Sequence, residues 1–223
     1  KKKKKDIIVG AGTYTDRLLA GTTSDYLCFK ADGEVIFDAS STGDSAFYNG
    51  KFWVVKGFKI VDVEQALQKS SNDQYRVNFH NCYIKNCPDW YIDLTMNELS
   101  AYNDNGCIFE NVGSTNLSTS HYARYWSFKD CMFINSWMPG YRDTGGAFSG
   151  NTFTPAVNSC VFVNTENNGI TNYYMSSVIL GSVRNCVFNQ HAVYRDNTGT
   201  KRSGSALAEY FNTNTGNYWE AGD

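Results

Sequence analysis

A five-residue motif that begins with cysteine returns five times along this chain of 223 residues. In each copy an aliphatic or aromatic residue stands two places after the cysteine, and four copies end in asparagine. The copies are Cys82–Asn86, Cys107–Asn111, Cys131–Asn135, Cys160–Asn164 and Cys186–Gln190, at intervals of 25, 24, 29 and 26 residues. Phe58–Asp62 is an earlier relative. Self-similarity at such a period indicates a repeat architecture.

The alternation within each copy selects the kind of repeat. A period of two indicates a strand, with the cysteine and the residue two places later on one face. A leucine-rich repeat lacks support, because neither its leucine frame nor a helix between copies is present, and propeller blades need about 40 residues. We therefore predict an all-β fold, a single-stranded right-handed parallel β-helix of about five to seven coils with small terminal caps.

Successive coils of a β-helix place equivalent positions about 4.8 Å apart. We expect an internal column of thiols, a parallel column of phenyl rings, and a ladder of asparagine amides where the strands end. A slip of one residue would turn both internal columns to solvent. The expected core ladder comprises Cys82, Cys107, Cys131, Cys160, Cys186, Phe109, Phe133, Phe162, Phe188, Asn86, Asn111, Asn135 and Asn164.

The repeat also suggests how the chain is divided. Residues 1–5 form a basic tail, 6–50 an N-terminal cap or first coils, 51–195 the β-helix, and 196–223 a C-terminal cap or interface segment. Within the N-terminal part, Tyr26–Lys30 and Glu34–Asp38 around a Gly-containing turn predict a hairpin. A capping pattern at Asp62 predicts a short helix reaching Lys69.

Charge and hydropathy limit the classes of partner that can be expected. Apart from the lysine run 1–5, the chain has 15 basic and 22 acidic residues. A body without a basic stripe is a poor nucleic-acid binder, so no nucleic acid is expected. No segment approaches the ~20 apolar residues that a membrane helix needs, so no membrane span is expected.

The seven cysteines raise the question of metals and disulfides. No CxxC pair exists and there are three histidines, whereas structural zinc sites use tighter pairs. Stacked cysteines have parallel Cβ atoms ~4.8 Å apart, too far for the ~3.8 Å of a disulfide. We expect buried free thiols, as in a reducing cytoplasm, with no metal and no cofactor.

Candidate catalytic residues are Asp104, Glu110 and Asp130, which fall on adjacent copies of the repeat. Polysaccharide hydrolases need two carboxylates about 5–10 Å apart on one outer face. The alternative, that these are solvated turn residues, is favoured, so the sequence leans against an enzyme. The aromatic residues Trp137, Tyr141, Tyr173 and Tyr174 are candidates for stacking on a glycan, or for burial between coils.

The outward strand positions carry a further signal. From the third copy on they are largely apolar, and Met132, Ile134, Val161, Val163 and Val187 would form one patch. Monomers seldom leave such a patch in water. We expect either a segment of the same chain or another subunit to cover it.

The run Val77–Asn86, VNFHNCYIKN, resembles a coil of the pectate-lyase-like right-handed β-helix superfamily, and the resemblance extends over roughly residues 50–195. That superfamily includes pectin-degrading enzymes, phage tailspikes and other virion β-helices. The resemblance to tailspikes implies a homotrimer, with other virion proteins and a surface glycan as partners. The first functional hypothesis is therefore a phage virion surface component: a tailspike, fibre or capsid-attached β-helix, made in a host cytoplasm.

Two further classes remain open. One is a polysaccharide lyase or glycoside hydrolase acting on a surface glycan. The other is a bacterial adhesin, which would place the protein outside the cell or on the cell surface. Fold alone does not separate these classes, because the repeated motif is a packing motif.

Overall fold

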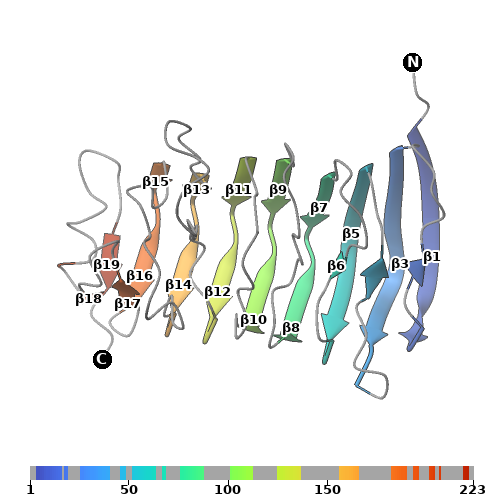
Figure 1. Ribbon diagram of the computed structural model, residues 1–223, viewed down its shortest axis with the longest axis horizontal. Coiled ribbons are helices and arrows are strands. Elements are labelled where there is room, and N and C mark those ends of the chain that lie inside the picture. Colours follow the sequence, from blue (N-terminus) through green and yellow to red (C-terminus); the bar gives the residue numbers. More distant parts are fainter. Residues whose placement is uncertain are drawn as a thin grey trace, which may run out of the picture.

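The chain winds into a parallel β-helix whose strands stand side by side in one row (Figure 1). The fold class predicted from the repeat is confirmed. This computed structural model describes residues 4–16, 18–19, 26–40, 46–48, 52–63, 67–68, 76–87, 101–112, 125–136, 156–165, 182–189, 193–195, 201–203, 206 and 218–220.

The strands are short and follow the repeat. In chain order they are β1 (Lys4–Tyr14), β2 (Leu18–Leu19), β3 (Tyr26–Asp38), β4 (Phe47–Tyr48), β5 (Phe52–Val61), β6 (Leu67–Gln68), β7 (Arg76–His80), β8 (Tyr83–Cys87), β9 (Ala101–Asn105), β10 (Ile108–Val112), β11 (Tyr125–Lys129), β12 (Met132–Ile134), β13 (Ala156–Asn158), β14 (Val161–Val163), β15 (Ser182–Arg184), β16 (Val187–Asn189), β17 (Val193–Arg195), β18 (Lys201–Ser203) and β19 (Tyr218–Glu220).

Two strand layers meet in β5, which pairs with β7 through its first half and with β8 through its second half. The first layer continues through β9, β11, β13 and β15, and the second through β10, β12, β14, β16 and β19. β1 pairs in parallel with β3, and β3 pairs in parallel with β5, so β1 and β3 extend the same sheet. These two strands add to the coils that the motif copies form, so the number of coils differs from the five to seven expected.

The bend between the two layers is made by one residue in the left-handed backbone region. This first corner directly precedes each motif, and its φ values lie between 51° and 77°. The residues are Gly57, Asn81, Gly106, Asp130, Ser159 and Asn185. Glycine and short polar residues tolerate this conformation best. The amide of the corner residue still donates to the next coil, as from Asn81 to the Asn105 carbonyl at 2.8 Å, so pairing continues around the bend.

A second left-handed corner ends the motif. It is occupied by Asp62, Asn86, Asn111, Asn135 and Asn164, with φ from 45° to 54°. Side-chain amides join neighbouring coils there. Asn86 donates to Asp62 at 2.7 Å, Asn111 to Asn86 at 3.0 Å, and Asn164 to Asn135 at 3.0 Å. The amides therefore fix the register of successive coils.

The interior contains two columns that follow from the motif. Phe109, Phe133, Phe162 and Phe188 stack with ring centroids 4.8–5.0 Å apart and interplanar angles of 8–10°. The five motif cysteines are buried beside them. Cys87 lies in another internal column, directly after the second corner, with Val63, Val112, Ser136 and Thr165. Cys87, which is not part of the motif, thus has a place in this second internal column.

Two local predictions were wrong. β3 runs unbroken through Ala31–Gly33, where the expected hairpin would turn, and an irregularity in register at that point stands in for the first corner. The strand on either side of this point pairs in parallel with both β1 and β5, and a hairpin would give up those ladders. The helix expected after Asp62 is wrong at Leu67–Gln68, which form β6. Asp62 itself occupies the left-handed second corner, a conformation that turns the chain rather than starting a right-handed helix.

Candidate functional site

The outward side of the second layer carries an apolar surface, here called the apolar lateral face. It consists of Ile108, Met132, Ile134, Val161, Val163 and Val187 on the adjacent strands β10, β12, β14 and β16. Ile108 is 38% exposed and the other five are half-buried. Ile108 was not in the predicted patch, although its outward position follows from the same alternation. Parallel register places the members directly beside one another.

A polar cluster borders the apolar lateral face. Tyr83 on β8 donates through its hydroxyl to Glu110 on β10, and Lys85 forms an ion pair with Glu110 at 2.9 Å. These bonds lower the pKa of Glu110 and raise the pKa of Lys85. Burial and the hydrogen bond to Glu110 raise the pKa of Tyr83. All three groups are therefore held in their ordinary charge states, as expected of a polar rim rather than of an acid–base centre.

The three candidate carboxylates do not share a surface. Asp104 is 1% exposed and points into the β-helix, whereas Glu110 lies on the outer side of β10 and Asp130 is an exposed first-corner residue. The groove that a polysaccharide lyase or hydrolase would build from these three side chains is therefore not formed. Register explains the difference, because Asp104 lies opposite Phe128, at an inward position.

Asp104 has a structural partner inside the coil. Its Oδ1 accepts a hydrogen bond of 2.8 Å from the backbone amide of Phe79 on the preceding coil. The corresponding inward residues on neighbouring coils, Phe79 and Phe128, are buried phenylalanines. The Asp104 carboxylate thus takes the place of a phenylalanine ring in this column. It accepts a hydrogen bond from the Phe79 amide at a point where His80 and Asn105 are the one residue pair between β7 and β9.

The cysteines form no metal centre in the part of the chain that the structure describes. No group of three or more histidine, cysteine or acidic side chains is arranged to hold an ion there. None of the seven cysteines forms a disulfide, and all seven are buried. Hydrogen bonding with the thiols of Cys131 and Cys82, together with burial, raises the pKa of Cys107. A buried thiol with a raised pKa is a poor nucleophile.

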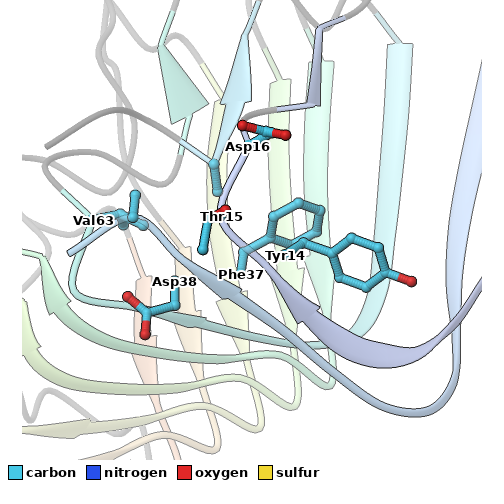
Figure 2. Close-up of a pocket in the computed structure, with 8 residues that line it drawn as sticks. Tyr14, Thr15, Asp16, Phe37, Asp38 and Val63 are labelled. Atoms are coloured by element: carbon cyan, nitrogen blue, oxygen red, sulfur yellow. The ribbon is translucent and has the colours of Figure 1, made fainter. Parts of the chain in front are cut away.

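A small pocket lies at the end of the β-helix where the chain begins (Figure 2). It is an open hollow too narrow to hold a water molecule, and its lining combines apolar side chains with two carboxylates. Its lining residues are Tyr14, Thr15, Asp16, Phe37, Asp38, Ala39, Ala46 and Val63. Asp38 accepts a hydrogen bond of 2.9 Å from the amide of Ser40, which lowers the pKa of Asp38. Sequence reasoning missed this pocket, because its residues come from three separate coils.

The candidate glycan-binding residues Trp137, Tyr141, Tyr173 and Tyr174 lie outside the described residues, so their prediction stands as made. In the described segments, no helix has the length and apolar character needed to cross a membrane. The chain matches no protein-family model, no curated protein and no solved structure.

Proposed function

We propose that this chain is a structural or host-attachment component of a virion surface, a β-helical rod of the pectate-lyase-like superfamily that assembles as a homotrimer. The apolar lateral face is the observation that carries the proposal. It runs along one side of the rod over four successive strands, with a rim of paired polar groups. An apolar centre with a polar rim is the anatomy of a protein–protein interface.

The interior supports a role that requires a rigid rod. Every described coil from β8 to β16 is tied to the next by parallel backbone pairing, and the ring stack runs through four of them. Continuous pairing and a packed ring stack oppose local opening of these described coils. Rigid coils of this kind suit display on a particle, where loops would contact a glycan or a neighbouring virion protein.

The position of the face supports threefold closure. Because the apolar lateral face lies on one side of the rod, parallel copies can bring their faces together around a common axis and close into a ring. A closed trimer covers all copies of the face equally. The carboxylate placement removes the groove on which the enzyme alternative depended, and no described feature favours the adhesin alternative over the virion role.

The substitution Ile108→Lys tests the assembly. It places an ammonium at the exposed margin of the apolar lateral face without entering the core, so the fold is expected to persist while lateral association is lost. Sedimentation equilibrium should show the wild-type mass falling by a factor of three in the variant, with an unchanged far-UV spectrum. A wild-type chain that does not form a multiple of three at micromolar concentration contradicts the trimer.

Labelling of particles tests the virion role. Antiserum against the purified chain is expected to label the surface of virus particles from the organism that encodes it, seen by immunogold electron microscopy. A lysate freed of particles serves as the control. Label on the cell envelope instead would support the adhesin, and reducing-sugar release by the purified chain would support the enzyme.

A further inference from the structure

We propose that the outer face of the first strand layer binds an acidic polysaccharide through a row of cationic and amide side chains, here called the basic row. The row has one member on each of β3, β5, β7, β9, β11, β13 and β15, which stand side by side (Figure 1). Its members are Lys30, Lys56, His80, Asn105, Lys129, Asn158 and Arg184. The inference goes beyond the proposed virion role, because it rests on the charges of the first layer and holds whether or not copies of the chain associate.

Parallel register makes the basic row continuous. Each member is the direct partner of the next across the sheet, from Lys30 with Lys56 at one end to Asn158 with Arg184 at the other. Adjacent strands lie about 4.8 Å apart, so the row extends over roughly 29 Å along the β-helix. Successive members stand one coil apart in the chain, and for this reason the sequence read along its length shows no basic stripe.

The members of the basic row point away from the core. On the strands from β3 to β11, the residue immediately before each member is buried: Phe29, Val55, Phe79, Asp104 and Phe128. Asn105, Lys129 and Arg184 are exposed, and the other four members are half-buried. The Lys129 side chain is 60% exposed. The row is therefore accessible to a ligand from solvent.

The basic row has four cations and no carboxylate. Strands β7, β9, β11, β13 and β15 contain a single acidic residue, Asp104, and its side chain is buried. Apart from the lysine run 1–5, the chain as a whole has 15 basic and 22 acidic residues. The face is thus opposite in sign to the average of the chain, and a surface of one sign concentrates ligands of the other.

Packing does not account for these cations. Lys30 and Lys56 stand directly opposite one another, and like charges at opposite positions destabilise a sheet. Asp6 neutralises Lys30 at 2.6 Å. Lys56 and Arg184 form no ion pair with another described residue. An anionic chain bound along the row would supply the counter-charge at both positions.

The arrangement favours a linear polymer that carries both anionic groups and hydroxyls. A single line of donors matches an extended chain, and a pyranose unit covers a distance similar to one coil. Ammonium and guanidinium groups bind carboxylate or sulfate oxygens, and side-chain amides bind hydroxyls. Asn158 accepts through Oδ1 from Asn185 at 3.2 Å and from Ser159 at 3.3 Å, so its Nδ2 group is the donor toward a ligand.

A nucleic acid fits the basic row less well. Proteins hold single strands by stacking bases on aromatic side chains, and the row contains no phenylalanine, tyrosine or tryptophan. Duplex DNA carries a phosphate about every 3.4 Å on each strand, a much denser charge than four cations over roughly 29 Å. An acidic polysaccharide is therefore the polymer that the row matches.

The substitution Lys56→Gln tests the basic row, and Lys59→Gln is its matched control. Both lysines belong to β5, but Lys59 lies in the half that joins the second layer and pairs with Glu34. Fluorescence anisotropy at low ionic strength measures binding of labelled alginate and heparin oligosaccharides. Lys56→Gln should weaken binding about threefold, and adding Arg184→Gln about tenfold in total. Lys59→Gln should leave binding unchanged.

The substitution Asp130→Asn should act in the opposite direction. It removes the carboxylate that lies 3.9 Å from the Lys129 ammonium, and asparagine tolerates the left-handed corner that Asp130 occupies. Affinity for the oligosaccharides should rise about twofold to threefold. Misfolding does not produce such a gain. The lysine run 1–5 is the same in every variant, so it does not enter the comparison.

The choice of probes identifies the anion. Tighter binding of alginate indicates a carboxylate polymer and tighter binding of heparin a sulfated one, and either result supports the proposal. The proposal is overturned if neither oligosaccharide binds, if neutral dextran binds equally well, or if Lys59→Gln weakens binding as much as Lys56→Gln. Tighter binding of oligothymidylate than of both glycans would overturn it in favour of a nucleic acid.

Sedimentation equilibrium separates this proposal from the trimer. Lys56→Gln should keep the wild-type mass while it loses affinity for the oligosaccharides. Ile108→Lys should lose the assembly and keep the wild-type affinity per chain. Failure of one proposal therefore leaves the result for the other intact.

Discussion

The substitution Phe133→Ala is expected to lower the free energy of unfolding by about 3–5 kcal/mol, the usual cost of emptying a buried phenylalanine site. The Phe133 ring lies between Phe109 at 4.8 Å and Phe162 at 5.0 Å, and meets Phe128 edge-on at 5.3 Å. It is fully buried, so its removal leaves a cavity in the middle of the stack. The stacked pairs add about 0.5–1.5 kcal/mol beyond area alone.

Urea unfolding followed by fluorescence measures this loss, and Phe133→Leu is the matched control. Leucine fills most of the site but forms no ring stack, so it should cost clearly less than alanine while still destabilising the protein. An alanine variant as stable as the leucine variant would mean that the stack can close over the gap, which a fixed coil spacing should prevent.

The substitution Asp104→Ala is expected to cost about 2–3 kcal/mol, from an unpaired buried amide together with a small cavity. The Phe79 amide donates to Asp104 at 2.8 Å inside the coil, and alanine removes that acceptor. Asp104→Asn keeps an acceptor oxygen of the same reach and should remain within about 1 kcal/mol of the wild type.

Amide hydrogen exchange at Phe79 gives a local readout for the same pair of variants. Exchange should accelerate in Asp104→Ala and stay slow in Asp104→Asn. An alanine variant with full protection at Phe79 would show that another group accepts this hydrogen bond, and the structural role assigned to Asp104 would then be wrong.

Much of the fold could be predicted because the repeat acts through local rules. Alternation around Cys131 and Phe133 sets which side chains face inward, and the interval sets the length of a coil. The asparagine that closes four of the five motif copies, such as Asn111, was expected at a strand end and lies at the second corner. The first corner was missed, although glycine, asparagine, aspartate or serine stands before every motif.

Other features could not be predicted, because they depend on neighbours distant in sequence. Asp62 begins a helix-capping pattern and also stands at the motif position that asparagine occupies in later copies. Its hydrogen bond with Asn86 of the next coil makes it part of the ladder. Asp104 was grouped with surface acids because a carboxylate ordinarily stays in water. Its burial became clear only from its register against Phe128 and its bond to Phe79.

The sequence by itself determined the parallel coil, its internal columns and the outward apolar positions, since period-two alternation and a constant interval are properties of the chain alone. Tertiary structure decided what pairing between coils controls: the unbroken course of β3, the inward carboxylate at Asp104, and the grouping of Asp16 and Asp38 from separate coils around one hollow. The physical reason is that a strand pairs with its neighbours only when the coil closes. That pairing then determines whether a polar residue lies in a turn, in the core or at an edge.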